Sequence, residues 1–348
     1  MKEIAINGKI YKIPNGLNDF QQKMYVHLIN WKWKNISIQS GNAQGHPYDA
    51  ILPEEIVERK EWPHIYPDIQ KALKAHRVKN DFRIHQHFYH MASSQAANIN
   101  LFLPILHHPA VNSILGAIKT DFASLATDCL DNGYCIEFWG KNFDPVSIGP
   151  DNKGLLGDKS KMAGTDSDIA IAYRNLQGEL CLWLIEHKLT EKEFTECGGY
   201  KSKGRQARHD CSKSFTQLLE APQSCYYKDV RKFKYWEITD ANRAFFANHS
   251  PHASCPFRGG MNQLWRNQLL ALSIEQESSQ PYKHVHFSVV RHLDNHHLDN
   301  TLAAYKELVA DKAKFSVFTS ADFLSAAKQQ CDTGLDKWIA WYNGLYRL

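Results

Sequence analysis

The sequence predicts an α/β fold with a mixed central sheet flanked by helices. Two apolar segments, residues 164–173 and 180–188, flank a polar turn that contains a glycine, which is the pattern of two paired strands. Apolar and polar residues then alternate over 285–289, as expected for a half-buried strand. Helical periodicity precedes the paired strands and recurs before the alternating one. The expected core order is therefore α-β-β-β-α-β.

Residues 1–84 are expected to form a mixed and helical extension at the N-terminus. The dipeptide Asn7-Gly8 is typical of a two-residue hairpin turn, so a small hairpin is predicted there. Apolar residues spaced by four from Phe20 to Leu28 follow a capping Asn18 or Asp19 and predict a helix.

Residues 85–348 are expected to hold the core. A helix is predicted around His85–Ile105; its three histidines lack the i, i+4 spacing of helical metal ligands, so they are expected to be exposed or hydrogen-bonded. Pro109 fits the first position of a second helix, whose apolar face runs to Leu125. The other expected elements are a strand near 134–138, the two paired strands, a helix at 261–275, strands at 285–289 and 315–318, and helices up to Leu348.

Composition excludes some classes of protein without selecting a function. No apolar run of the 348-residue chain approaches 18 residues, so no membrane span is expected. The N-terminus lacks a signal-peptide pattern, and the eight cysteines are expected to be reduced or to bind a metal rather than to form disulfides, which favours a cytoplasmic location. A net charge of +4 permits a nucleic-acid partner but does not require one. There is no Gly-rich phosphate loop, so no ATPase motor is expected.

The paired strands are expected to gather charged side chains at one end. If their turn is centred on Gln177, Asp168 lies opposite Glu186 and Asp166 lies opposite Lys188, all on one face. Two carboxylates about 5 Å apart repel by about 3 kcal/mol at an effective dielectric near 20, so a cation between them is favoured. Hard oxygen ligands suit Mg²⁺ or Mn²⁺. A solvated, salt-bridged strand end is the other interpretation, because a register slip of one residue would separate the set.

These residues resemble a known motif. Asp168, followed by Glu186-His187-Lys188 at the end of the next strand, resembles the signature of the PD-(D/E)XK nuclease superfamily, which has the restriction-endonuclease-like fold. Ser167 stands where that signature usually has proline. Segments 93–104, 234–237 and 262–267 also resemble a bacterial group of restriction-endonuclease-like proteins, so the likeness covers most of residues 85–348.

The resemblance implies a metal-dependent nuclease that hydrolyses DNA phosphodiester bonds in restriction, defence or DNA processing. It implies that Asp168, Glu186 and the main-chain carbonyl of His187 coordinate Mg²⁺ (or Mn²⁺). Lys188 would orient the attacking water and help to deprotonate it. The alternative is a nucleic-acid-binding or scaffold subunit that keeps the nuclease fold, stabilised by a cysteine metal site. The intact set of three charged residues argues against that alternative.

Several further residues are candidates for supporting roles. Asp166 is either a second metal ligand or a turn residue, and Glu137 on the preceding strand is either an additional carboxylate or a surface residue. Gln217 resembles the auxiliary glutamine that the superfamily carries on the following helix. Basic residues in the same region either neutralise DNA phosphates or form a solvated loop; they are Lys201, Lys203, Arg205 and Arg208. The choice between DNA and RNA, and a homodimer or partner protein, stay open.

A second constellation lies in the cysteine-containing insertion, residues 195–258. Its four cysteines lack the C-x-x-C pair typical of zinc sites, but their neighbours are polar, unlike those of buried structural thiols; they are Cys197, Cys211, Cys225 and Cys255. Some nucleases of the resembled superfamily carry a four-cysteine iron–sulfur cluster, so Zn²⁺, [4Fe-4S] and unrelated free thiols are all open. The remaining cysteines are expected to fill the core; they are Cys129, Cys135, Cys181 and Cys331.

Overall fold

The computed structural model describes residues 1–80, 82–140, 153–160, 164–250, 252–330 and 334–348. Within these residues, the main sheet has six strands in the order β10-β9-β8-β7-β5, and β6 also pairs with β7. Strands β5 to β8 are antiparallel, whereas β8, β9 and β10 run parallel, so the sheet is mixed as predicted. The strands are β5 (Phe122–Leu125), β6 (Tyr134–Phe138), β7 (Ser167–Asn175), β8 (Leu180–Lys188), β9 (His284–Arg291) and β10 (Phe315–Thr319).

Strands β7 and β8 form a hairpin with the predicted register. Ile169 pairs with Ile185 and Arg174 with Leu180, which places the centre at Gln177. The side chain of Asn175 accepts the N–H groups of Gln177 and Glu179, and Gly178 adopts a φ of +78° in the turn. Local turn chemistry therefore sets the pairing of the two longest strands.

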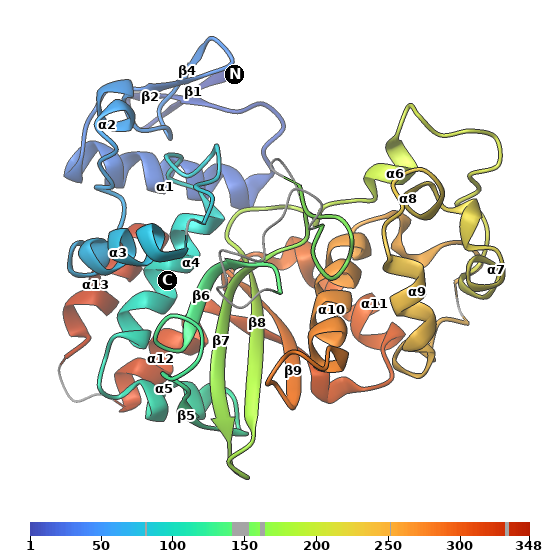
Figure 1. Cartoon of the computed structure of the whole chain (residues 1–348). Coiled ribbons are helices and arrows are strands. Elements are labelled where there is room, and N and C mark those ends of the chain that lie inside the picture. The colour runs from blue at the N-terminus through green and yellow to red at the C-terminus, as the bar shows by residue number, and fades with distance from the viewer. Residues whose placement is uncertain (81, 141–152, 161–163, 251, 331–333) are drawn as a thin grey trace.

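Helices cover both faces of the sheet (Figure 1). One apolar core joins the odd-numbered side chains of β7 and β8 to the first helical layer, and the even-numbered side chains pack against the second layer. Because both faces are buried, the two strands are almost continuously apolar in sequence. The first layer consists of α4 (Ser94–Leu106), α5 (Val111–Ile118), α12 (Ser320–Gln330) and α13 (Asp336–Tyr346). The second consists of α9 (Tyr235–Ala241), α10 (Met261–Gln276) and α11 (Asp299–Leu308).

The N-terminal segment begins as predicted and packs onto the first layer. Strands β1 (Lys2–Ile6) and β2 (Lys9–Ile13) pair across the Asn7-Gly8 turn, and Asn18 closes a capping box at the start of α1 (Asp19–Asn35). Apolar residues of α1 belong to the same core as α4 and α13, although the predicted division at residue 84 stays a prediction. The other elements are β3 (Gly41–Ala43), β4 (His46–Tyr48), α2 (Glu54–Glu58) and α3 (Gln70–Asn80). None of the described helices is both long and apolar enough to cross a membrane.

Two predicted helices are shorter than expected. The helix predicted from His85 begins only at Ser94, because Ser93 caps it. Before this cap, the rings of His85 and His90 accept main-chain N–H groups two residues further on, which favours turns. The helix predicted to reach Leu125 ends at Ile118, and β5 follows it, because this segment pairs with β7.

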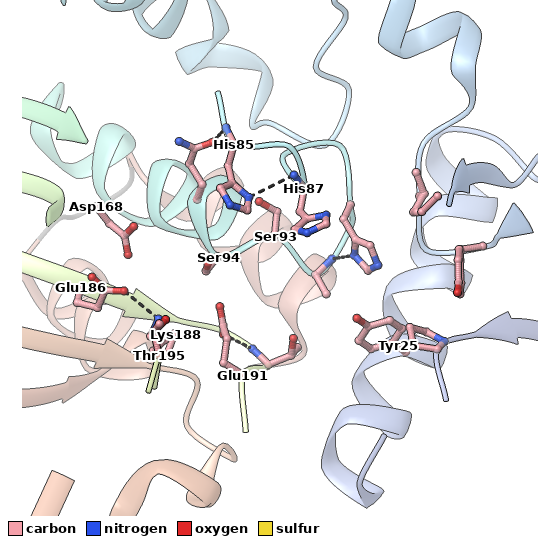
Figure 2. Close-up of a pocket in the computed structure, with 18 of the residues that line it drawn as sticks. Tyr25, His85, His87, Ser93, Ser94, Asp168, Glu186, Lys188, Glu191 and Thr195 are labelled. Carbon is pink, nitrogen blue, oxygen red and sulfur yellow. Dashed lines mark hydrogen bonds and ion pairs between the residues drawn. The ribbon is translucent and has the colours of Figure 1, made fainter. Parts of the chain in front are cut away.

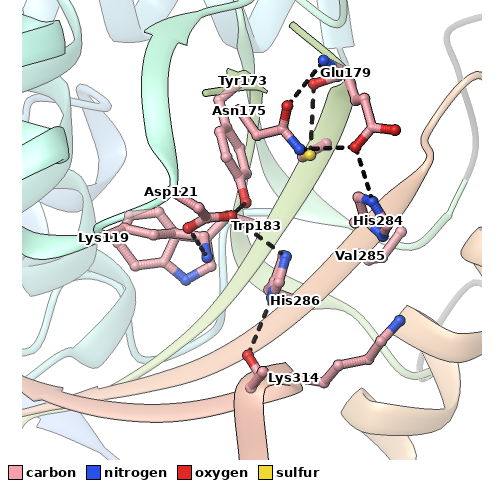
Figure 3. A network of polar contacts seen from close by, with 12 residues as sticks. Lys119, Asp121, Tyr173, Asn175, Glu179, Trp183, His284, Val285, His286 and Lys314 are labelled. Carbon is pink, nitrogen blue, oxygen red and sulfur yellow. Dashed lines mark hydrogen bonds and ion pairs between the residues drawn. The ribbon is translucent and has the colours of Figure 1, made fainter. Parts of the chain in front are cut away.

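A polar network fastens β5 to the far end of the sheet (Figure 3). Asp121 accepts the hydroxyl of Tyr173 at 2.7 Å and forms an ion pair with Lys119 at 2.6 Å. The Lys119 ammonium also lies 5.4 Å and 5.9 Å from the ring centroids of Tyr173 and Trp183. Lys119 is therefore a largely buried lysine whose charge is paired, and it lies at the end of the sheet opposite Lys188.

The cysteine-containing insertion has only short helices. Its helices α6 (Gly198–Lys201), α7 (Phe215–Glu220) and α8 (Tyr226–Asp229) span four to six residues, and α9, which belongs to the second layer, spans seven. Cys135 and Cys181 are buried as predicted and Cys129 is half-buried, while Cys331 lies outside the described residues.

Candidate active site

The ends of β6, β7 and β8 open into a pocket of about 620 Å³. Its floor carries acidic side chains together with Lys188, and the turn before α4 and part of the N-terminal segment form the opposite wall (Figure 2). Five acidic residues line the pocket; they are Glu137, Asp166, Asp168, Glu186 and Glu191. The structure therefore brings together the three residues of the sequence motif and adds three carboxylates.

A row of acidic residues crosses three adjacent strands. In the ladder between β6 and β7, Ile136 pairs with Ile169 and Phe138 with Ser167, so Glu137 lies opposite Asp168. The hairpin register, continued by one residue, places Asp168 opposite Glu186. Side chains at neighbouring ladder positions are about 5 Å apart, which is a strongly repulsive spacing for the carboxylates of Asp168 and Glu186.

Asp168 is held by a main-chain donor from β8 and by a side-chain donor from α4. The main-chain N–H of His187 donates to Oδ2 of Asp168 at 2.6 Å, and the amide of Asn98 on α4 donates to the main-chain oxygen of Asp168 at 3.2 Å. In the described part of the chain, the other carboxylate oxygen accepts no hydrogen bond. Figure 2 shows this carboxylate next to the Glu186 side chain.

Glu186 is buried and fixed at both oxygens. Oε1 lies 2.9 Å from the Lys188 ammonium and accepts from the amide of Gln263 at 2.8 Å. Oε2 accepts from the amide of Asn267, also at 2.8 Å. Gln263 and Asn267 are one turn apart on α10 and therefore face the same side of the helix. This helix thus orients the carboxylate from the side opposite α4.

The interpretation of Glu137 as a surface strand residue is wrong. Its carboxylate faces the pocket and accepts the amide of Gln95 from α4 at 2.8 Å. Its backbone has a φ of +54°, in the left-handed region that non-glycine residues rarely adopt. Such strain is common at functional sites, where the surrounding contacts maintain it. Strand alternation alone could not have predicted this side-chain direction.

The carboxylates of the pocket raise the pKa values of one another. Burial raises the pKa of Asp168 well above its usual range, and the charges of Glu186 and Glu137 add to the shift. Burial, then the charges of Asp166 and Glu186, raises the pKa of Glu137 to about 8. Burial also raises the pKa of Asp166, although Lys159 opposes this shift from 3.2 Å away. The site carries more negative charge than its own cations balance.

Lys188 is the cation at the centre of this cluster. Burial tends to lower its pKa, but the charges of Glu186, Glu191 and Asp168 outweigh burial and raise the pKa above its usual value. The side chain is only 9% exposed, so its ammonium is a fixed, protonated donor within the pocket.

Gln217 does not lie in this pocket. It is exposed on α7, where its side chain closes a capping box with Ser214. Gln263 on α10 contacts Glu186 instead. Gln263 and Asn267 lie in segment 262–267, which resembles the restriction-endonuclease-like group. Their i, i+4 spacing on a predicted helix was the signal that could have identified them as partners of Glu186.

The predicted DNA-binding residues lie in the insertion and do not line the pocket. Lys201 pairs with Glu196 and Arg208 with Asp229, whereas Arg205 donates to main-chain oxygens. Lys203 is exposed. The four cysteines of the insertion line a separate, smaller cavity.

The donor atoms of the pocket suit a hard cation, although they are not arranged as a finished site. Among the described residues, no three His, Cys, Asp or Glu side chains are grouped as a ready metal-binding set. Glu186 uses both oxygens for hydrogen bonds, and Asp168 uses one. Carboxylate oxygens in a negatively charged pocket nevertheless suit Mg²⁺ and Mn²⁺, which prefer oxygen ligands.

Comparison with known proteins identifies one family. The model of a family described as "Restriction Endonuclease associating with ARP" matches residues 25–346. Neither the comparison with curated proteins nor that with solved structures finds a match. The matched range includes all three acidic strand ends, both supporting helices and the insertion. The chain therefore belongs to the restriction-endonuclease family whose members are described as associating with ARP.

Proposed function

We propose that the protein is a nuclease that uses a divalent cation to hydrolyse DNA phosphodiester bonds, in restriction, defence or DNA processing in the cytoplasm. The observation that carries this proposal is the row of Glu137, Asp168 and Glu186 beside the buried Lys188. Membership of a restriction-endonuclease family supports the same conclusion.

Asp168, Glu186 and the main-chain carbonyl of His187 would hold Mg²⁺ or Mn²⁺, and Asp166 or Glu137 could supply a further oxygen. A cation there would relieve the repulsion that raises the pKa of Asp168. When bound, such a cation supplies Lewis-acid stabilisation of the charge that develops on the phosphate.

The protein groups have separate tasks in this proposal. Gln263 and Asn267 hold Glu186 in one orientation, so little reorganisation is needed during the reaction. The Lys188 ammonium orients the attacking water and donates to the developing charge on the phosphate. Because carboxylates keep Lys188 protonated, its ammonium must release a proton before it can accept one from water, and neutralising the carboxylates would favour that release.

DNA contacts outside the pocket also belong to the proposal. Lys203 is exposed and forms no ion pair within the described residues, so it is available to a phosphate. Lys201 and Arg208 would first have to leave Glu196 and Asp229, and Arg205 would have to leave its main-chain partners. DNA affinity from this region should therefore depend more on Lys203 than on the other three.

The family description favours a second candidate function. The description names ARP as a partner of the family's members, so the chain could act as a nucleic-acid-binding or scaffold subunit of a complex. The two functions differ in turnover. A nuclease cleaves nucleic acid on its own or when ARP is added, whereas a scaffold binds it without cleavage under either condition.

The experiment that tests the proposal is incubation with supercoiled, linear and single-stranded DNA and with RNA. Each substrate is given with Mg²⁺, with Mn²⁺ and with EDTA, in the presence and absence of the ARP partner. We expect cleavage of DNA with either cation and none with EDTA. Binding without cleavage of any substrate would favour the scaffold instead.

The divalent cation should stabilise the fold, and the effect should grow with pH. In the metal-free protein the pKa of Glu137 is about 8, against an ordinary value of 4.5, so the folded state retains protons that the unfolded state loses. The contribution of Glu137 to the free energy of unfolding is therefore fully present below pH 4.5 and is lost as the pH rises through about 8. Asp168 and Asp166 shift in the same direction.

A fixed Mg²⁺ concentration of about 100 times the dissociation constant at about pH 8 should add about 2.7 kcal/mol to the free energy of unfolding at that pH. The same concentration should add less at about pH 5, where protons compete with the cation. Thermal unfolding with and without Mg²⁺ at about pH 5 and about pH 8 measures this difference. The Glu137→Gln variant should show a weaker pH dependence of metal-free stability. A Mg²⁺ effect that is no larger at the higher pH would contradict the cation-binding role of the pocket.

A further inference from the structure

We propose that Cys197, Cys211, Cys225 and Cys255 bind one structural zinc ion that fastens the insertion to the start of α10. The four residues come from separate segments of the chain, yet all line one cavity of about 10 Å³. This site lies outside the carboxylate pocket, and its role does not depend on the nuclease function.

The fold gathers four thiols that are far apart in sequence. Thirteen residues separate Cys197 from Cys211 and Cys211 from Cys225, and 29 residues separate Cys225 from Cys255. All four nevertheless line the same cavity, and Cys197 is buried there. The even spacing in sequence does not bring them together; the folded insertion does.

A backbone N–H group already points at one of the sulfurs. The amide of Tyr200 donates to Sγ of Cys197 at 3.3 Å. This donor lies three residues after the cysteine, so a local turn presents it to the sulfur. Hydrogen bonds from outside the ligand shell orient metal ligands and stabilise their charge.

The size and chemistry of the cavity favour a single zinc ion. A space of about 10 Å³ is close to that of one water molecule, which matches a single ion. Four thiolates at about 2.3 Å in a tetrahedron form a closed structural zinc site. The four side chains are not yet grouped as a ready set among the described residues, so they must rotate inward to bind.

The position of the site explains what zinc would stabilise. Buried aromatic residues anchor part of the insertion in the core, but its first helices, α6, α7 and α8, span only four to six residues and are too short to be stable alone. The main-chain N–H of Cys197 donates to the carbonyl of Arg258, just before α10, at 3.3 Å. Nearby, the N–H of Thr195 donates to the side chain of Gln263 at 3.1 Å, and Gln263 in turn holds Glu186. The zinc site would thus brace the helix that orients the pocket carboxylate.

Elemental analysis of the full-length protein, purified without an affinity tag and dialysed against metal-free buffer, tests the proposal. We expect about one zinc per chain, released when a mercurial reagent has modified the thiols. Replacement by Co²⁺ should give the thiolate charge-transfer absorption of a tetrahedral site. The Cys211→Ser and Cys225→Ser variants should lose the zinc, whereas the Cys129→Ser control, at a half-buried thiol outside the cavity, should keep it.

The wild-type measurement remains decisive if the variants fail to fold. Wild-type protein without zinc, iron with sulfide in its place, or a disulfide between two of these cysteines would each overturn the proposal. Zinc retained by both variants would overturn it as well. The Glu186→Gln protein should keep its zinc, so failure of this proposal and failure of the nuclease proposal are distinguishable.

Discussion

The Asp168→Asn and Glu186→Gln proteins are expected to lose hydrolysis by more than about 100-fold, since even residues that only support a metal ligand are worth 10–100-fold. Each substitution removes a negative oxygen that the cation would bind. Calorimetric titration should also show weaker Mg²⁺ binding. The Asp168 variant should be at least as stable as the wild type in EDTA, because it removes repulsion from Glu137 and Glu186.

The Glu186 variant should behave differently in stability. A glutamine offers only one acceptor oxygen, so one of the donors from Gln263 and Asn267 loses its partner, at a cost of about 1–3 kcal/mol. Glu275→Gln is the matched control: Glu275 lies on the same helix, pairs with Lys314 and accepts the N–H of Val285 at 2.8 Å, outside the pocket. It should lower stability and leave cleavage unchanged. Undiminished cleavage by Glu186→Gln would contradict the assignment.

Lys188→Met should abolish hydrolysis while sparing the binding of Mg²⁺. The substitution removes the donor that orients water, but none of the oxygens that would hold the cation. In EDTA the variant should be less stable by about 3–5 kcal/mol, because it leaves a buried carboxylate without its partner. Urea unfolding and calorimetric Mg²⁺ titration measure the two effects.

Lys119→Met provides the control for burial of a lysine. Lys119 pairs with Asp121 at the opposite end of the same sheet, with a side chain only 11% exposed. Its loss should also lower the free energy of unfolding, but cleavage should remain at the wild-type rate. If Lys188→Met retained full cleavage, or if both variants lost it equally, Lys188 would have no specific role in the reaction.

Local signals were sufficient to predict the centre of the candidate site. The turn at Gly178 and the two apolar strands determine the hairpin register, and that register places Asp168 beside Glu186. The two residues lie on the face that α10 covers. Side-chain alternation then determines which residues share the pocket.

The rest of the site depends on tertiary packing that no local pattern reveals. Glu137 enters the pocket through a left-handed backbone conformation, which the β6 sequence does not signal. Gln217 follows the motif strand in sequence, as the auxiliary glutamine of the superfamily does, but its side chain takes part in a capping box at the start of α7. Gln263 reaches Glu186 because α10 packs across the end of the sheet.

Contacts outside the local sequence also explain why two predicted helices are shorter than expected. Residues 122–125 have a helical apolar spacing, but pairing with β7 makes them a strand. His85 and His90 lie on turns because Ser93 provides a better helix start. For the cysteines, spacing alone could not predict that all four would line one cavity, because the chain between them has few regular elements.

Anomalous diffraction from a crystal soaked in Mn²⁺ tests the central claim most directly. We predict a manganese peak in the pocket, bounded by the carboxylates of Asp168 and Glu186 and the main-chain carbonyl of His187, with metal–oxygen distances of about 2.1 Å. The absence of a peak there, at a Mn²⁺ concentration that supports DNA cleavage, would contradict the account.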